Sequence, residues 1–199
     1  MRIVFATGNN DKMREIRQIL GGFTEDIVSM KDAGIDIDIV EDGSTFEENA
    51  MIKARAVHEH CKDAIVLADD SGLEIDFLNK EPGIYSARYL GRETPYPEKN
   101  AIILDKLKDV PDEKRSARFV CAIAACLPGG EEIVVRGTME GRIGYEIAGE
   151  NGFGYDPIFF LPEYGKTSAE LLPEEKNAVS HRGKALRMME EKLKEIFNA

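Results

Sequence analysis

The residues Asp69-Asp70-Ser71-Gly72 directly follow the apolar run 64–68, and this pattern predicts a buried strand that ends in a turn. Ligands of α/β proteins gather at the carboxyl ends of such strands. Successive side chains diverge there, so we expect one of the two aspartates to point into a site. That carboxylate could bind Mg²⁺ or position and deprotonate a water molecule, and Ser71 could donate to a phosphate.

A second carboxylate and a lysine belong to the same hypothesis. Glu41 precedes a predicted helix and is the natural second ligand, because Mg²⁺ usually takes one or two carboxylates and completes its shell with water and phosphates. Glu47 and Glu48 fall in the first turn of that helix, where negative charge is stabilising. Lys53, two turns in, could reach a phosphate, although a solvated surface lysine is the commoner role.

The turn that follows the first predicted strand suits an anionic group. Thr7-Gly8-Asn9 joins the strand 2–6 to a helix that carries Lys12, so that glycine, a helix N-terminus and a cation come together. The turn lacks the longer glycine-spaced segment of a Walker A loop. A purely structural strand-to-helix turn is the alternative.

Two further segments have residue types that could contact a base. In the glycine-flanked loop 151–157, Phe153 could stack on a base, or it could be a hydrophobic plug. His181 and Arg182, near the start of the last predicted helix, are donors suited to a purine keto oxygen and N7. The alternative is a helix start capped by Ser180. The group His58, His60 and Cys61 is a poor zinc site, because no second cluster completes four ligands.

Composition narrows the class of protein. The chain has 199 residues, and its 43% hydrophobic content excludes a disordered polyanion. Its net charge of -11 argues against a nucleic-acid partner, because phosphate binding needs a basic surface. The whole acidic excess lies in the segments 32–52 and 69–81. Three cysteines do not form a disulfide framework, and no apolar run approaches a membrane span, so we expect a soluble cytoplasmic protein without a membrane partner.

The elements that must position these residues alternate between strand and helix. Helical spacing is predicted after the turn 7–10, up to Gly21-Gly22, and also over 46–61, 98–108 and from 182 onward, with Thr45 and Glu48 as a capping box. Strands are predicted over 2–6, 64–68, 118–127 and 132–136, the last two joined as a hairpin through Pro128-Gly129-Gly130. The pattern predicts an α/β protein with a mixed sheet, and no linker divides 1–199 into separate domains.

Taken together, six segments in order resemble the inosine triphosphate pyrophosphatase family. The matching segments are Thr7-Gly8-Asn9-x-x-Lys12, Thr45-Phe46-x-Glu48-Asn49-Ala50 with Lys53-Ala54, Ala68-Asp69-Asp70-Ser71-Gly72-Leu73, Pro82-Gly83-x-Tyr85-Ser86-Ala87-Arg88-Tyr89, Phe153-Gly154-Tyr155-Asp156-Pro157 and Ser180-His181-Arg182. Each segment alone is weak, but their number and order are specific. Tyr155, where some members carry Trp, is a mild departure.

The resemblance implies a fold and an activity. It implies an elongated α/β fold with a mixed central sheet and flanking helices, two lobes around a central active-site cleft, and a homodimer. It also implies hydrolysis of inosine, deoxyinosine and xanthosine triphosphates to the monophosphate and pyrophosphate, with Mg²⁺. Alternatives are a pyrophosphatase for modified pyrimidine or canonical nucleotides, and a nucleotide sensor without turnover.

The resemblance also implies roles for residues. Asp70 would be the catalytic base and, with Glu41, a metal ligand. The remaining candidates would bind substrate, the first eight at its phosphates or sugar and the others at its base: Thr7, Gly8, Asn9, Asn10, Asp11, Lys12, Lys53 and Ser71; Phe153, Gly154, Tyr155, Asp156, Lys176, His181 and Arg182.

Overall fold

The computed structural model describes residues 1–197 and contains a mixed seven-stranded sheet. Its strands are β1 (Ile3–Phe5), β2 (Ile27–Ser29), β3 (Ile65–Ile75), β4 (Ser116–Cys126), β5 (Glu132–Ile143), β6 (Phe159–Leu161) and β7 (Lys166–Thr167). Their order in the sheet is β2-β1-β3-β4-β5-β6-β7. β1 pairs in parallel with β2 and β3, whereas β6 pairs antiparallel with β5 and β7, so the predicted α/β class with a mixed sheet is confirmed.

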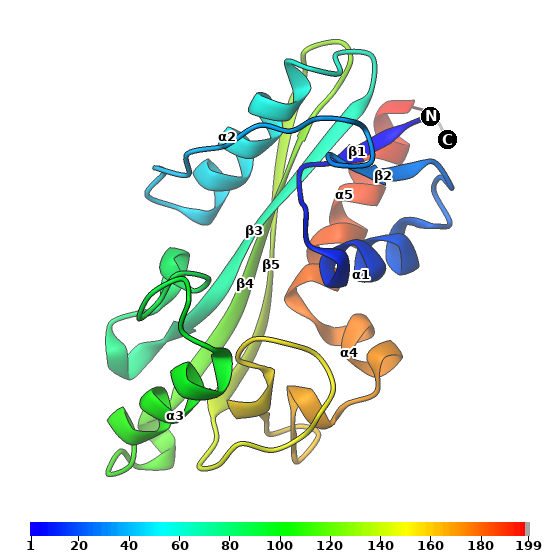
Figure 1. Ribbon diagram of the computed structural model, residues 1–199. Coiled ribbons are helices and arrows are strands. Elements are labelled where there is room, and N and C mark those ends of the chain that lie inside the picture. The colour runs from blue at the N-terminus through cyan, green and yellow to red at the C-terminus, as the bar shows by residue number, and fades with distance from the viewer. Residues whose placement is uncertain (198–199) are drawn as a thin grey trace. The chain divides into compact units, whose positions relative to one another are not determined.

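Five α-helices accompany the sheet within residues 1–197 (Figure 1). They are α1 (Asn10–Leu20), α2 (Phe46–His58), α3 (Tyr96–Lys106), α4 (Pro173–Val179) and α5 (His181–Phe197). None of these helices is long and apolar enough to cross a membrane. The predicted helices are all found, with ends that differ by a few residues from the expected ones.

The chain folds into two compact units. The first unit comprises residues 1–70, 121–137 and, within the described chain, 181–197; the second comprises residues 71–120 and 138–180. The long strands β3, β4 and β5 each contribute residues to both units. Every contact described below lies within one unit.

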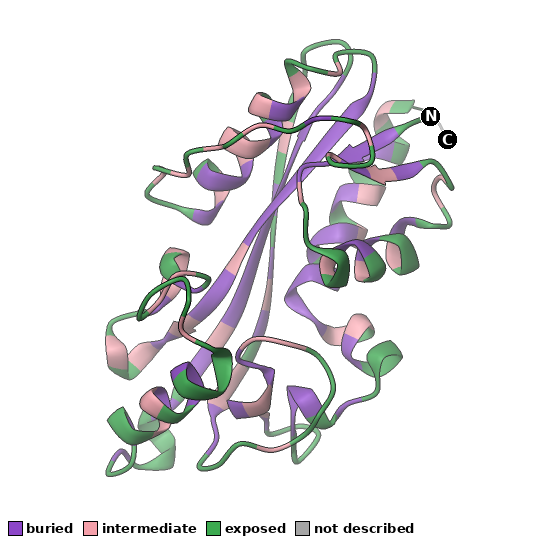
Figure 2. Ribbon diagram, in the orientation of Figure 1, coloured by how far each residue is buried: buried purple, intermediate pink, exposed green. Residues whose placement is uncertain are grey.

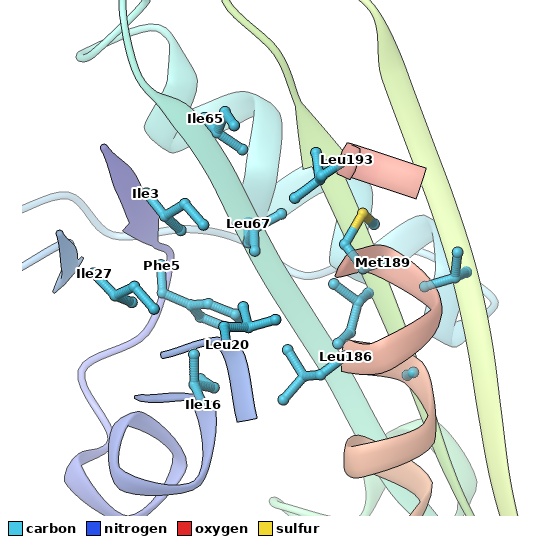
Figure 3. Packing of buried hydrophobic residues seen from close by; sticks show 14 of the residues in the cluster. Ile3, Phe5, Ile16, Leu20, Ile27, Ile65, Leu67, Leu186, Met189 and Leu193 are labelled. Carbon is cyan, nitrogen blue, oxygen red and sulfur yellow. The ribbon is translucent and has the colours of Figure 1, made fainter. Parts of the chain in front are cut away.

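In the first unit, α1 and α5 pack their apolar sides against the buried strands. Ile16 and Leu20 of α1, and Leu186, Met189 and Leu193 of α5, are fully buried in one cluster with residues of β1 and β3 (Figure 3). Each such side chain contributes roughly 1.5–3 kcal/mol by leaving water. The side chains recur every three or four residues, as the sequence predicted, and they hold both helices against the sheet.

The second unit has its own apolar cluster. Leu73 and Ile75 of β3 and Ile103 of α3 are fully buried in it. Figure 2 shows β3 mostly in the colour of buried residues. The rings of Phe119 and Phe159 meet with their centroids 4.5 Å apart. This cluster anchors α3 and the loop that precedes β6.

The predicted end of β3 is wrong. The strand does not stop at Asp69-Asp70-Ser71-Gly72 but continues to Ile75. It can continue because cationic side chains neutralise both aspartates, and because Leu73 and Ile75 find apolar partners in the second unit. The two carboxylates therefore lie within a regular strand, where successive side chains point to opposite faces of the sheet.

The start of α2 also differs in detail from the predicted capping box. Thr45 Oγ1 accepts a hydrogen bond from the Glu48 N–H at 3.1 Å, as expected of an N-cap. The Glu48 carboxylate, however, accepts from the Ser44 N–H and hydroxyl, each at 2.7 Å, rather than from Thr45. Ser44 thus shares the capping role, and the loop before α2 is fixed one residue further upstream.

Candidate active site

Asp69 is the centre of a buried ion-pair network in the first unit. Its side chain is 1% exposed, and Oδ1 accepts from Lys12 Nζ at 3.0 Å, while Oδ2 lies 3.4 Å from Arg182 Nη2. Burial alone would raise the pKa of Asp69, but the charges of Lys12 and Arg182 outweigh it and hold the pKa well below its usual range. Asp69 therefore stays ionised and joins α1, β3 and α5.

Arg182 is committed to carboxylates on two elements. Its side chain is 3% exposed, and besides Asp69 it pairs with Glu15, one turn beyond Lys12 on α1. The α5 helix can begin this close to the sheet because β5 has Gly137 there: a Cβ at that position would lie 2.4 Å from the His181 carbonyl oxygen. His181, the first residue of α5, is itself 7% exposed.

Asp70 meets a different set of groups. Lys53 Nζ, from α2, lies 2.8 Å from Glu41 Oε2 and 3.4 Å from Asp70 Oδ1. Figure 1 shows α2 on one side of β3 and the helices α1 and α5 on the other, so neighbouring aspartates face different helices. Glu41 and Asp70, the two predicted metal ligands, are thus brought together around one cationic nitrogen.

The environment of Asp70 changes its acidity. Burial raises the pKa of the Asp70 carboxyl, Lys53 opposes that change, and the negative charges of Glu41 and Asp69 add to it. Asn49 Nδ2 lies 3.3 Å from Asp70 Oδ2, and Asn49 Oδ1 accepts from the Gly43 N–H at 2.9 Å. Asn49 therefore orients the carboxylate from the opposite side to Lys53.

The donor set at Glu41 and Asp70 fits a hard divalent cation. Both residues present carboxylate oxygens, which Mg²⁺ prefers, and both already surround a positive charge. Within residues 1–197, no group of three or more His, Cys, Asp or Glu side chains is arranged to bind a metal. Two carboxylates leave the remaining positions of an octahedral ion to water and phosphate oxygens.

Hydrogen bonds between residues two or three positions apart stabilise the first turn, Thr7–Lys12. Thr7 Oγ1 accepts from the Asn9 N–H at 3.1 Å, and Asn9 Oδ1 accepts from the N–H groups of Asp11 and Lys12 at 2.9 and 3.1 Å. Asn9 is therefore the N-cap of α1. A phosphate at this turn would compete with Asn9 for two of the helix N–H groups.

In the second unit, Asp156 organises the loop that carries the predicted base-binding residues. Its carboxylate is 2% exposed and accepts from the Phe153 N–H at 2.8 Å, from Ser168 Oγ at 2.9 Å and from Lys176 Nζ at 2.8 Å. The Lys176 ammonium also lies 5.0 Å from the centroid of the Phe153 ring. The loop thus presents a half-buried aromatic ring beside a buried cation.

Tyr155 points into the core of the second unit. Its hydroxyl donates to the Ser86 carbonyl at 2.7 Å, and its ring meets the Tyr96 ring edge to face, with centroids 5.2 Å apart. Ser86 Oγ in turn accepts from the Leu73 N–H at 2.9 Å. Hydrogen bonds therefore join the motifs 82–89 and 153–157 to each other, and the first of them to β3.

The predicted site residues divide between the two units. The first unit holds the phosphate and metal candidates other than Ser71, together with two of the base candidates, and the second holds Ser71 and the other base candidates. Members of the first unit are Thr7, Gly8, Asn9, Asn10, Asp11, Lys12, Glu41, Lys53, Asp70, His181 and Arg182; members of the second are Ser71, Phe153, Gly154, Tyr155, Asp156 and Lys176.

Sequence reasoning missed several residues that hold these candidates in place. Glu15 pairs with Arg182, Asn49 with Asp70, and Ser168 with Asp156. A signal existed for Glu15, which lies three residues after Lys12 and so shares its helix face, and for Asn49, which lies within a matching motif. No signal pointed to Ser168.

Comparison with known proteins gives the family. Residues 3–192 match the model of the Ham1 family. A dITP/XTP pyrophosphatase of Clostridium perfringens is 48% identical, with 98% of each chain covered. A protein of the same name from Exiguobacterium sibiricum is also 48% identical, with 96% of each chain covered.

Solved structures agree in fold over nearly the whole chain. A Ham1 protein from Coxiella burnetii superposes with a TM-score of 0.88 at 41% identity, covering 98% of this chain and 99% of that one. A nucleoside-triphosphatase / dITP/XTP pyrophosphatase from Mycobacterium abscessus gives 0.77 at 45% identity, covering 95% and 98%. The resemblance inferred from the six motifs is confirmed, and the chain belongs to the Ham1 family.

Proposed function

We propose that this chain is a nucleoside-triphosphate pyrophosphatase that hydrolyses the non-canonical purine nucleotides ITP, dITP and XTP to the monophosphate and pyrophosphate. The observation that carries the proposal is 48% identity, over 98% of both chains, to a relative named dITP/XTP pyrophosphatase. Removal of such nucleotides keeps altered bases out of the pool. The cluster of Lys53, Glu41 and Asp70 supports a hydrolytic rather than a purely binding role.

The phosphate chain is assigned to residues of the first unit. Lys12 and Lys53 supply positive charge, and Thr7, Asn9 and the turn residues Gly8, Asn10 and Asp11 surround the start of α1. Ser71, next to Asp70 on β3, is assigned to the sugar or phosphates. Attack of water on a phosphoryl group needs alignment and charge neutralisation more than covalent chemistry, and cations on separate elements provide both.

Glu41 and Asp70 are assigned to Mg²⁺. A bound Mg²⁺ would supply charge neutralisation at the phosphates. The pair fits this ion because both carboxylates already converge on one cation, and such an ion would reconcile the acidic protein with an anionic substrate. Lys53, which lies between them, is free to turn toward a phosphate once another cation takes over both carboxylates.

Asp70 is also assigned as the base that takes a proton from the attacking water. Burial raises the pKa of this carboxyl, with Lys53 opposing and Glu41 contributing, and a raised pKa makes a carboxylate a stronger base. Asn49 and Lys53 hold the carboxylate from two sides. Asp69, by contrast, is fully engaged by Lys12 and Arg182 and is assigned a positioning role.

The base is assigned to Phe153, Gly154, Tyr155, Asp156 and Lys176, with His181 and Arg182. Hypoxanthine and xanthine carry a keto oxygen where adenine carries an amino group. A site that donates hydrogen bonds to that oxygen leaves its donors unpaired with adenine, and such mismatches reject an analogue by about 10⁴-fold or more. Lys176 and the Phe153 ring provide a donor and a stacking surface side by side.

Three further proposals rest on the family alone. The chain acts as a single pyrophosphatase domain over 1–199, it forms a homodimer, and it works in the cytoplasm, where the nucleotide pool lies. The three free cysteines suit a reducing compartment. Light scattering coupled to gel filtration tests the dimer directly.

A nucleotide panel tests the proposed function. ITP, dITP, XTP, GTP, ATP and a modified pyrimidine triphosphate are incubated with the protein, with and without Mg²⁺, and pyrophosphate and phosphate are measured separately. We expect Mg²⁺-dependent release of pyrophosphate from the first three. Equal rates on ATP would contradict the specificity, and binding without turnover would indicate a nucleotide sensor.

A further inference from the structure

Two adjacent polar residues of α3 are almost completely buried in the second unit. Lys99 is 1% exposed and Asn100 is 2% exposed. Apolar side chains such as Ile103 fill the rest of the buried side of this helix. Burying a charge and an amide costs free energy that an apolar residue would not cost, so the two residues call for a reason other than stability.

Lys99 bonds to a carbonyl rather than to a carboxylate. Its Nζ donates to the Ala87 carbonyl oxygen at 3.0 Å and lies 5.0 Å from the centroid of the Tyr96 ring. Within residues 1–197, no carboxylate forms an ion pair with it. The positive charge is therefore balanced only by a carbonyl dipole and an aromatic face.

Only the nitrogen of the Asn100 side-chain amide forms a hydrogen bond in the described structure. Its Nδ2 donates to the Gly154 carbonyl oxygen at 3.1 Å, whereas Oδ1 is buried and has no hydrogen-bond partner in the described structure. A buried acceptor without a partner costs about 1–3 kcal/mol. The contribution of this residue thus lies in holding the Gly154 carbonyl.

The two carbonyls belong to two different loops that meet at α3. Ala87 follows Ser86, whose carbonyl accepts from the Tyr155 hydroxyl at 2.7 Å. Gly154 precedes Tyr155, whose ring rests on the Tyr96 ring of α3. Lys99 and Asn100 therefore hold two neighbouring chain segments, 86–87 and 154–155, from one helical turn.

The conformation of the second loop depends on this contact. Gly154 has a φ of +68°, which favours glycine, and the Tyr96 ring lies 3.6 Å from where its Cβ would be. The peptide group held by Asn100 lies between Phe153, whose N–H bonds to Asp156, and Asp156 itself. Gly154, which carries this carbonyl, directly follows Phe153, whose ring centroid lies 5.0 Å from the Lys176 ammonium.

From this geometry we infer that Lys99 and Asn100 are positioning residues for the base-binding loop 153–156, and that they set the selectivity for purines with a keto group. The inference rests on the proposed function. A small displacement of a binding group can lower the rate by up to about 100-fold. We expect this loss of rate to differ between a nucleotide with a keto purine and one with an amino purine. A merely structural role would lower the rates for all nucleotides together.

The test compares Lys99→Met and Asn100→Leu with the parent protein. Lys99→Met nearly keeps the volume of the side chain, Asn100→Leu keeps its number of non-hydrogen atoms, and both remove the donor. Lys106→Met is the matched control, because Lys106 is an exposed lysine of the same helix that donates to the Tyr89 hydroxyl at 2.8 Å. KM, kcat and the thermal midpoint are measured with ITP and ATP in the presence of Mg²⁺.

We expect KM for ITP to rise and the ratio of kcat/KM for ITP over ATP to fall about tenfold or more in both variants, with thermal midpoints at or above that of the parent. The control keeps the parental ratio. Lys99→Arg, which restores a donor, recovers part of the ratio. Asn100→Ser, which is polar but too short to reach Gly154, behaves as Asn100→Leu.

Two outcomes would overturn the inference. One is a parental ITP/ATP ratio in folded variants, and the other is loss of the folded protein in Lys99→Met, Asn100→Leu and Asn100→Ser alike, which would assign both residues to stability. A parent protein that does not hydrolyse ITP would instead contradict the proposed function. The two failures are therefore distinguishable.

Discussion

The Lys53 ammonium lies 2.8 Å from Glu41 Oε2, and the same nitrogen is 3.4 Å from Asp70 Oδ1. Burial lowers the pKa of Lys53, but the charges of Asp70, Asp69 and Glu41 outweigh it and raise the pKa above its usual value. Lys53 therefore stays charged and holds together the two carboxylates that are assigned to Mg²⁺. Its charge also opposes a second cation at the same place.

Replacing Lys53 with Met should therefore change Mg²⁺ affinity and kcat in opposite directions. We expect Mg²⁺ to bind more tightly to the variant without substrate, because the competing charge is gone. We expect kcat to fall about 10²- to 10³-fold, because a cation assigned to the phosphates is lost. Titration calorimetry with MgCl₂ measures the first effect and pyrophosphate release from ITP the second.

Lys62→Met is the control for this experiment, since Lys62 is an exposed lysine that pairs with Glu59, the C-cap of α2. It should change neither quantity. Unchanged or weaker Mg²⁺ binding in Lys53→Met would show that Lys53 does not hold the place of the metal.

Asp70→Asn should lower kcat by about 10²- to 10⁴-fold, the usual contribution of a general base. The fold should not suffer. A carboxyl whose pKa is raised by burial stabilises the protein below its unfolded pKa and loses that stability as the pH rises through its folded pKa. At pH 7 a neutral amide at Asp70 is thus at least as stable, and calorimetry should give a thermal midpoint no lower than the parent's.

Two results would contradict the role assigned to Asp70. If Asp70→Asn binds substrate and hydrolyses it at the parental rate, the assignment of both base and metal ligand fails. If the variant unfolds at pH 7, the carboxylate is part of the structural framework.

Asp69→Asn should behave in the opposite way. The pKa of Asp69 is held low, so its charge stabilises the fold above the unfolded pKa of about 3.9, and that stability is lost as the pH falls. Removing the charge leaves Arg182 buried with only one of its two carboxylates, at a cost of about 3–5 kcal/mol. Urea unfolding at pH 7 and pH 2 should show a large loss of stability at pH 7 that shrinks at pH 2, because pH 2 lies well below the unfolded pKa. An equal loss at both pH values would contradict the role of the charge.

Asp69 and Asp70 show which parts of the structure could be predicted from the sequence and which could not. Helical and strand periodicity predicted α1, α2, α5 and the hairpin of β4 and β5, because apolar spacing reports burial directly. It also predicted that Asp69 and Asp70 diverge. It missed the continuation of β3, because two adjacent carboxylates are typical of a turn unless distant cations neutralise them.

Those cations come from far along the chain. Arg182 is 113 residues from Asp69, and Lys12 is 57 residues from it. Such pairings follow from the path of the sheet, which local patterns do not contain. The sequence did not predict a role for Asn100 for the same reason, because its hydrogen-bond partner, Gly154, is 54 residues away.

The three cysteines should differ in reactivity in the native protein. Burial raises the pKa of the Cys121 thiol to about 12 and that of Cys126 to about 11, whereas Cys61 is partly exposed. At pH 8 we expect a disulfide reagent to modify about one thiol per chain, and all three after unfolding in guanidinium. Cys61→Ser should abolish the native reaction. Three equally reactive native thiols would contradict the burial of β4.

Gly152 provides a test of the Asp156–Lys176 pair that leaves both charged residues in place. Gly152 has a φ of +74°, and a Cβ there would lie 2.3 Å from Asp156 Oδ2 and 3.2 Å from Lys176 Nζ. Asp156 cannot easily yield, since the Phe153 N–H and Ser168 also hold it. Gly152→Ala should therefore displace the pair and lower the kcat/KM for ITP by about tenfold or more.

Gly165→Ala separates this effect from backbone strain. Gly165 also has a positive φ, +62°, in the same unit, but nothing lies within 4 Å of where its Cβ would be. Both variants bear the cost of a side chain in the left-handed region, roughly 1 kcal/mol of stability. Only Gly152→Ala should lose activity on ITP. If the two variants lose activity equally, strain alone is responsible, and the Asp156–Lys176 pair has no part in reading the base.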